Sequence, residues 1–464
     1  MTKSLKIKTD IDMCSRPLLG KIVKFSLPLI ATGVLQLLYN AADIIVVGRF
    51  ASADAMAAVG STGALINLII NVFVGLSIGA LSATARAIGA NDRDGAEKIV
   101  HTSMLISLIG GILFGIFGFF ASEYLLNLMH TPASILPLSA IYLKIYFVGL
   151  PFNAIYNFGS SVLRACGDTK NPLIFLTISG IINVVLNLIF VIVFKMSVAG
   201  VAVSTIISQA ISAVLIVICL MRRNGYGKLE FKKLRINKRA LLIILRIGLP
   251  AGIQSTIFSL SNVIIQSSIN SVGNIAMAGN SSAANLEGFA YISMNAISQA
   301  CLTFTGQNFG ANNKKNCSLV LMQTLILTTI IGLIVGCGLY FASPLLLRLY
   351  NTDPTVVAYG IERLKIIGTT YFLCGIMEVL VGAMRGVGKS MLPMLISIFG
   401  VCAIRIIWIY TVFKKTNNLI MLYMSYPVSW LITCIILVVF LIFAQRRAFA
   451  KINANKPKID NTLV

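Results

Sequence analysis

The sequence has few charged residues. Only 11% of its 464 residues are Asp, Glu, Lys or Arg, whereas a soluble globular protein has roughly 25%, and 57% are hydrophobic. This composition excludes a water-soluble main body. Apolar runs of about 20 residues, the length that crosses a bilayer as a helix, recur along the chain. We count twelve, among them 173–194, 198–221, 319–341 and 419–444.

Residues typical of metal centres and enzyme active sites are scarce. His101 and His130 are the only histidines, and each lies beside an expected loop with no partner motif. The nine cysteines show no paired spacing, and most fall inside apolar runs, where cysteine acts as a small hydrophobic residue. We therefore expect no enzyme, no metal site and no cofactor.

Acidic residues are outnumbered by basic ones, 15 to 38, which gives a formal net charge of +23. This charge does not indicate a nucleic-acid partner, because the basic residues gather in the gaps between apolar runs, above all in 222–240. By the positive-inside rule, the bias places both termini and this gap in the cytoplasm. We expect a multi-pass protein of the cell (inner) membrane, with the lipid bilayer as its surroundings.

The two halves of the sequence resemble each other at a nearly fixed offset. Two pairs of segments lie 221 positions apart and a third pair 222 apart, so one insertion suffices. Chance similarity between apolar segments would not keep one offset across loops and helices. The matched segments are 163–172 with 384–393, 89–91 with 310–312, and 27–28 with 249–250.

The repeat predicts the fold. We expect an all-α membrane protein with twelve transmembrane helices in two six-helix bundles, related by a pseudo-twofold axis along the membrane normal. The predicted parts are an N-terminal lobe at 1–221, a basic cytoplasmic linker at 222–240, and a C-terminal lobe with its tail at 241–464. Gly75 and Gly79 have the spacing of close helix packing. We expect a monomer.

Asp43 lies inside the first apolar run. A charged side chain at the middle of a membrane helix costs about 2.5–3.5 kcal/mol, so an acid at such a position points to function. The alternative is a helix-end acid that reaches the headgroups. The repeat places Ile264 or Ile265 at the equivalent position of the second half, so the architecture does not require the acid. This asymmetry favours a functional interpretation.

Two further acids, Glu287 and Glu378, lie in the eighth and tenth apolar runs, and Arg405 lies in the eleventh. For these acids two interpretations stay open. They serve transport, or they form structural ion pairs, for which Arg405 and Arg385 are available to Glu378.

Amide side chains recur inside the apolar runs. Asn183 and Asn187 are one helical turn apart, hence on one face. Amides can simply join helices through hydrogen bonds. Beside a carboxylate they can also build an ion site, because a carboxylate in a partly dry cavity binds and releases a proton, and oxygen atoms also suit sodium. We expect a substrate cavity lined by Gln36, Tyr39, Asn153, Asn157, Glu287 and Glu378.

Several motifs together resemble the multidrug and toxic compound extrusion (MATE) family, from Leu27 to about Phe443. They are Leu27-Pro28 followed by Asp43, the segments 88–91 and 163–172, Val198–Ala202 leading to Gln209, and 306–311. The resemblance implies two lobes around a cavity that opens alternately to each side. It also implies an ion site of Asp43, Asn183 and Thr205. Some members have a second acid where this chain has Asn187, so the coupling ion, H⁺ or Na⁺, stays open.

These observations predict a secondary antiporter that exports organic, often cationic, drugs or toxins in exchange for H⁺ or Na⁺. The predicted ion site is Asp43, Asn183, Asn187 and Thr205, with Na⁺ as the one metal ion that Asp43 could hold. Two alternatives remain. One is a flippase for lipid-linked precursors of the same superfamily, which would have a more basic cavity and often more helices. The other is a channel or sensor without ion coupling.

Overall fold

Helices make up nearly the whole structure. The computed structural model describes residues 10–454, and this part of the chain contains no strand. The first six long helices are α1 (Leu19–Phe50), α2 (Ala53–Gly89), α3 (Arg93–Leu128), α4 (Leu136–Ala165), α5 (Lys170–Leu188) with its π-helical end η1 (Ile189–Val193), and α6 (Ser197–Arg222). The chain ends expected in the cytoplasm lie mostly outside the described residues.

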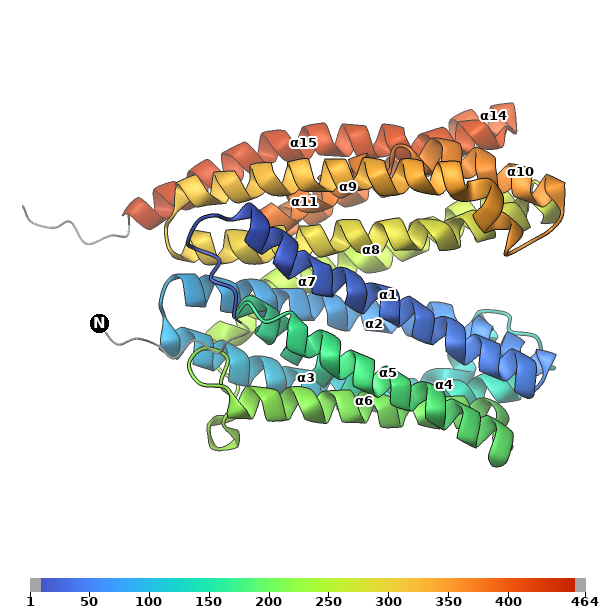
Figure 1. Cartoon of the computed structure of the whole chain (residues 1–464), viewed down its shortest axis with the longest axis horizontal. Coiled ribbons are helices and arrows are strands. Elements are labelled where there is room, and N and C mark those ends of the chain that lie inside the picture. The colour runs from blue at the N-terminus through green and yellow to red at the C-terminus, as the bar shows by residue number, and fades with distance from the viewer. Residues whose placement is uncertain (1–9, 455–464) are drawn as a thin grey trace, which may run out of the picture. The chain divides into compact units, whose positions relative to one another are not determined.

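A short 3₁₀ turn, η2 (Phe231–Lys233), precedes the second set of helices. These are α7 (Lys238–Asn270), α8 (Asn274–Gly310), α9 (Lys314–Arg348), α10 (Pro354–Arg363) with η3 (Leu364–Gly368), and α11 (Tyr371–Gly386). They are followed by α12 (Met391–Ser397), η4 (Ile398–Ala403), α13 (Ile404–Trp408), η5 (Ile409–Phe413), α14 (Lys414–Thr416) and α15 (Leu419–Ala454). Figure 1 shows the order of these helices along the chain.

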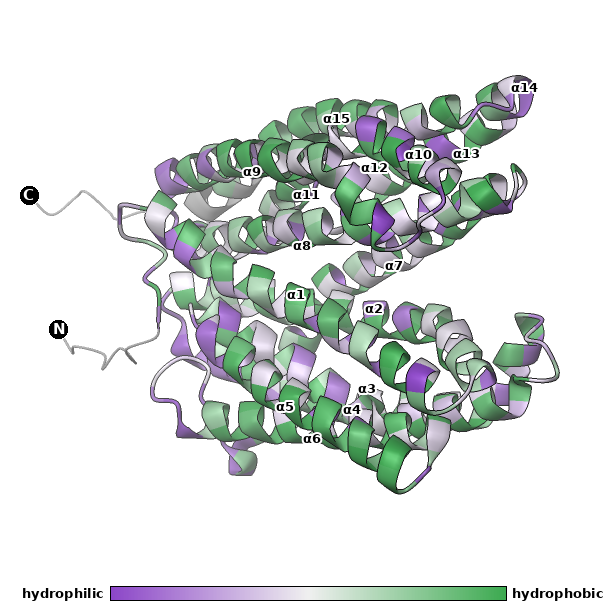
Figure 2. Ribbon diagram, turned by 45° about the vertical axis from the view of Figure 1, so that its right-hand side comes forward, coloured by the Kyte–Doolittle hydropathy of each residue, from purple (hydrophilic) through white to green (hydrophobic). Residues whose placement is uncertain are grey.

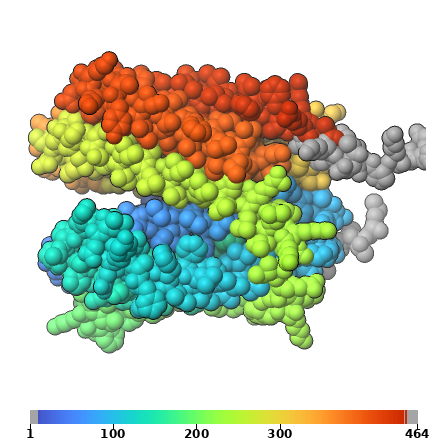
Figure 3. Space-filling view, turned by 180° about the vertical axis from the view of Figure 1, so that it is seen from behind, coloured from blue at the N-terminus to red at the C-terminus, as the bar shows by residue number. Residues whose placement is uncertain are grey.

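The chain forms two compact units. Unit 1 contains residues 1–12, 23–88 and 92–260, and unit 2 contains 13–22, 89–91 and 261–464. In unit 1, α4 packs against α3 and α6, and α5 against α6. In Figure 3 the atoms of residues in the range of α3 and α4, coloured blue to turquoise, form a continuous surface. In unit 2, α8 packs against α9 and α11, and α11 against α15. The predicted domain limits of 1–221, 222–240 and 241–464 stay a prediction.

Most of the helices are long and apolar enough to cross a membrane. Among the described residues ten helices meet this requirement, and the bent pair α10–η3 and α11, with an angle of 44° at its break, makes an eleventh. The remaining long helix, α8, has 37 residues but carries many Ser, Thr and Asn side chains. Figure 2 shows hydrophobic residues along the helix bodies and hydrophilic residues mainly near their ends. The multi-pass membrane prediction is confirmed.

The backbone of the connections repeats at the offset found in the sequence. Asp92 caps α3 by accepting a hydrogen bond from Gly95 N, and Asn313, 221 residues later, caps α9 by accepting one from Asn316 N. The preceding residues also match, since Asn91 and Asn312 have φ of 56° and 55°. Asx side chains suit both positions because they cap helices and tolerate left-handed backbone. The repeat therefore specifies turns as well as helices.

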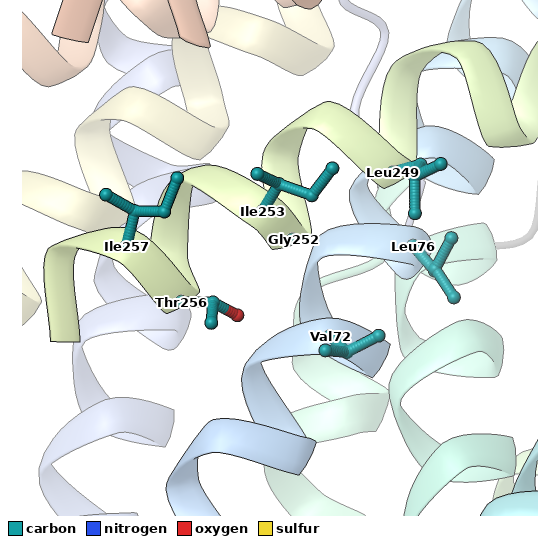
Figure 4. Close-up of a pocket in the computed structure, with 7 residues that line it drawn as sticks. All are labelled: Val72, Leu76, Leu249, Gly252, Ile253, Thr256 and Ile257. Atoms are coloured by element: carbon teal, nitrogen blue, oxygen red, sulfur yellow. The ribbon is translucent and has the colours of Figure 1, made fainter. Parts of the chain in front are cut away.

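Glycines bring α2 close to α7 within unit 1. Added Cβ atoms on Gly75 and Gly79 would collide with the backbone of Gly252 and Gly248, so only glycine permits this approach. Beside the contact lies an apolar pocket of about 240 Å³, shown in Figure 4. Its lining is Val72, Leu76, Leu249, Gly252, Ile253, Thr256 and Ile257. With Thr256 as the one polar side chain in this lining, the pocket suits apolar contact, and it holds none of the predicted site residues.

Candidate ion and substrate sites

Asp43 is buried in unit 1, with 9% of its surface exposed. It lies on α1, and its Oδ1 accepts a hydrogen bond of 2.5 Å from Asn187 Nδ2 on α5. One turn earlier on α1, the Tyr39 ring packs on Gly180 of α5, where a larger residue would collide with it. These two contacts hold the Asp43 carboxyl against α5 and away from surrounding solvent or lipid.

The amides continue this site to α6. Asn187 Nδ2 also donates to Asn183 Oδ1 at 3.3 Å, and Asn183 Nδ2 lies 3.5 Å from Thr205 Oγ1. The four predicted ion-site residues, Asp43, Asn183, Asn187 and Thr205, therefore form one connected group. Helical spacing explains this, because residues four apart on α5 share the face that meets α1 and α6.

One oxygen of this group has no partner. Asn187 is fully buried, and its Oδ1 accepts no hydrogen bond from any residue that the structure describes. A buried acceptor without a partner costs about 1–3 kcal/mol. A bound cation could take this oxygen as one of its ligands. Alternatively, a protonated Asp43 could donate a hydrogen bond to it once the Asn187 amide has rotated. The arrangement therefore suits either ion.

Two tyrosines of α4 also surround Asp43, and sequence reasoning missed them. Tyr142 and Tyr146 are buried, lie one turn apart with ring centroids separated by 6.3 Å, and are close enough to interact electrostatically with Asp43. Tyr146 also hydrogen-bonds Gln209 on α6. Aromatic residues are common in membrane helices, so only the polar face that they share with the asparagines would have revealed them.

The predicted cavity residues of unit 1 form two smaller groups. Tyr39 donates weakly from its hydroxyl to Thr177 O at 3.4 Å, and Gln36 is exposed near it on α1. On α4, Asn157 Nδ2 donates to Asn153 Oδ1 at 2.9 Å, and both side chains are half-buried. No hydrogen bond between described residues joins either pair to Asp43.

Glu287 of unit 2 belongs to a buried ion pair. Arg363 on α10 donates from Nε and Nη2 to the two carboxylate oxygens of Glu287 on α8, at 2.8 and 2.7 Å. Arg363 Nη1 donates to Asn280 Oδ1, and Asn280 in turn donates to Gln266 Oε1 on α7. The structural alternative for Glu287 therefore has a specific partner, Arg363. Sequence reasoning missed it because 76 positions separate the two residues along the chain.

Glu378 lies on α11 and is buried. It interacts electrostatically with Arg385, two turns further along the same helix, and an ion pair between the two stays a prediction. The other predicted partner, Arg405, instead donates from Nε to Ser429 Oγ on α15 at 3.0 Å. The two buried acids among the described residues of unit 2 therefore each interact with an arginine, whereas Asp43 lies among amides and tyrosines.

A polar cluster also lies in the connections of unit 1. Arg223 forms an ion pair of 2.5 Å with Asp10 and lies 3.6 Å from Asp168. Burial raises the pKa of the Cys166 thiol to about 12 in the connection between α4 and α5, despite the nearby Arg223. Further along, His101 Nε2 accepts a hydrogen bond from Glu230 N at 3.0 Å. These contacts give His101 and Asp168 structural roles.

A family model decides the identity of the chain. The MatE model matches twice, over residues 28–189 and 250–411, and the two matches start 222 positions apart, which is the offset of the segments 27–28 and 249–250. The chain belongs to the MatE family. Members of this family are transporters and not enzymes, so the predictions of a non-enzyme and of a two-lobe helical fold are confirmed.

Relatives and solved structures agree with this membership. The chain is 29% identical over 395 residues to a probable multidrug resistance protein, YpnP, of Bacillus subtilis, covering 85% of this MatE chain and 88% of the relative. It is 23% identical over 400 residues to an FAD transporter of Shewanella oneidensis, covering 84% and 87%. An outward-facing multidrug resistance MATE transporter of the MOP superfamily superposes with a TM-score of 0.88 at 22% identity, covering 96% and 99%.

Proposed function

We propose that this MatE chain is a secondary antiporter that exports organic drugs or toxins in exchange for H⁺ or Na⁺. The observation that carries the proposal is the buried Asp43 carboxyl, which accepts a hydrogen bond from Asn187, an amide whose own oxygen has no partner among the described residues. Such a group can bind an ion from one side of the membrane and release it to the other when the protein changes conformation. The resemblance of the first helix to that of the family supports the same assignment.

The driving force suffices for useful export. One charge that moves through 100 mV releases about 2.3 kcal/mol, which supports a concentration ratio of about fiftyfold for a neutral solute. In this proposal Asp43, Asn183, Asn187 and Thr205 hold the ion. Gln36, Tyr39, Asn153 and Asn157 contact substrate, together with Glu287 and Glu378. The protein acts as a monomer in the cell (inner) membrane, with both termini in the cytoplasm.

The test is ion-driven efflux in inverted vesicles with Asp43→Asn. We expect the substitution to abolish accumulation driven by the ion gradient, because an amide cannot exchange a charge. Asp54→Asn is the matched control, since Asp54 is an exposed acid in the first turn of α2. Accumulation with and without sodium, and with the proton gradient collapsed, identifies the ion.

Three results would contradict the proposal. Unchanged accumulation by a folded Asp43→Asn protein would remove Asp43 from coupling. Transport that neither saturates nor depends on an ion gradient would favour a channel. Movement of lipid-linked precursors without efflux of drugs would favour a flippase.

A further inference from the structure

Arg405 carries a buried positive charge for which residues 10–454 supply no ion-pair partner. It lies on α13 with 5% of its surface exposed. Its Nε donates to Ser429, but its Nη2 group has no hydrogen-bond partner, and no carboxylate lies within ion-pair distance among the residues that the structure describes. A buried charge is costly unless it is paired, so an unpaired guanidinium indicates a ligand that is not part of the chain.

The charge balance of unit 2 leads to the same conclusion. Its buried charged side chains, among those described, are Glu287, Arg363, Glu378, Arg385 and Arg405. Glu287 forms a bidentate ion pair with Arg363, and Glu378 interacts electrostatically with Arg385. One positive charge remains, and it belongs to Arg405.

Aromatic rings surround this guanidinium. Its central carbon lies 4.0 Å from the ring centroid of Tyr426 and 5.3 Å from that of Trp430. Tyr371 packs edge-on against Trp430 at 5.5 Å. Ring faces attract a cation by about 0.5–2 kcal/mol, which does not replace a hydrogen-bonded anion, but they offer edges and faces to a flat aromatic ligand.

We infer that Arg405, with Tyr371, Tyr426 and Trp430, forms a binding site for an aromatic organic anion, a carboxylate or phosphate on a flat ring system. The oxyanion accepts hydrogen bonds from the guanidinium, and its ring packs against the three aromatic side chains. Because these side chains are largely buried, the ligand enters when the cluster opens during the transport cycle. The inference rests on the proposed export function and specifies one class of its substrates.

The test uses Trp430 as a reporter. The chain has two tryptophans, so Trp408→Phe leaves Trp430, which lies against Arg405, as the only source of tryptophan fluorescence. The purified protein is titrated with four probes that share one ring: benzoate, phenyl phosphate, benzamide and benzylammonium. We expect the anions to change the emission saturably and the neutral and cationic probes not to do so. Benzoate against phenyl phosphate then distinguishes the preferred oxyanion.

Substitutions separate binding from folding. Arg405→Gln should weaken binding of the preferred anion by at least about tenfold, because a charge-assisted hydrogen bond is lost. If that variant does not fold, Arg405→Lys carries the test, since it keeps the charge but loses the planar fork, and we expect a smaller but measurable loss. The matched control is Arg348→Gln, an exposed arginine of the same unit.

The outcomes are distinguishable from those of the antiport test. Equal responses to all four probes, or unchanged anion affinity in a folded Arg405→Gln or Arg405→Lys protein, would overturn the inference. Asp43→Asn should keep anion binding even where it abolishes ion-driven efflux. Anion binding without antiport would therefore refute only the proposed function, and antiport without anion binding only this inference.

Discussion

The two units differ in the charges that they bury. Around Asp43, unit 1 supplies asparagine, threonine and tyrosine side chains and no cation within ion-pair distance among the described residues. In the part of unit 2 that the structure describes, three arginines and two glutamates are buried, and one bidentate ion pair joins Arg363 to Glu287. The helices and turns follow the repeat, but the buried polar residues do not.

This difference indicates that the two units have different functions, ion exchange in unit 1 and binding of an anionic substrate group in unit 2. An acid without a cation is free to exchange its ion, whereas Glu287 is held by Arg363 and cannot exchange an ion without breaking a buried pair. The excess positive charge in unit 2 instead suits an anionic group of a substrate. Comparing substitutions between the units tests whether this division is real.

The largest expected effect is on the ion pair of unit 2. Arg363→Gln leaves Glu287 buried without its cation, and breaking such a pair by removing one partner costs about 3–5 kcal/mol. We expect a strongly lowered melting temperature in detergent. The double variant Glu287→Gln with Arg363→Gln should recover much of the loss, because two neutral amides can hydrogen-bond each other.

Arg348→Gln on α9 is the control for this experiment, since Arg348 is exposed. If Arg363→Gln melted at the same temperature as Arg348→Gln, the pair would not stabilise unit 2, and Glu287 would again be a candidate for coupling.

A medium effect on stability is expected when an acid is introduced into unit 2 at the position that corresponds to Asp43 of unit 1. Ile265 on α7, one of the two residues that the repeat makes equivalent to Asp43, is 2% exposed. Ile265→Asp puts a carboxyl there without the amides that surround Asp43, at a cost of about 2.5–3.5 kcal/mol. Thermal unfolding should show a clear loss relative to Ile265→Leu, which keeps the volume. Equal stability of the two variants would mean that burial of Asp43 needs no special surroundings.

Sequence reasoning predicted what depends on periodicity and spacing. The helices, the repeat and the shared face of Asn183 and Asn187 follow from patterns that one sequence contains. The contact between Asp43 and Asn187 could be anticipated, because the resemblance to the MATE family placed the two residues in one predicted ion site.

The partners of the other ionisable residues could not be predicted in this way. Arg363 is the last residue of α10 and lies 76 positions from Glu287, so only the packing of α10 on α8 shows that the two side chains meet. Likewise the rings around Arg405 come from α11 and α15, and no local pattern marks them.

The smallest effect is expected for an exposed ion pair of the linker in unit 1. Glu230 accepts hydrogen bonds from Lys228 and Lys233, which lower its pKa. Because the carboxyl pKa is lowered in the folded protein, these ion pairs add to the stability of the fold at pH values above the ordinary carboxyl pKa. This added stability is lost as the pH falls through the lowered pKa. Because solvent screens these charges, Glu230→Gln should leave the melting temperature unchanged at neutral and at acidic pH.

Lys232→Gln, an exposed neighbour, is the control for this last substitution. The hydrogen bond from Glu230 N to His101 is made by the backbone and survives the change of side chain. A pH-dependent loss of stability in Glu230→Gln alone would show that the linker charges are not screened. Stability would then depend on surface charge as well as on the buried charges in which the two units differ.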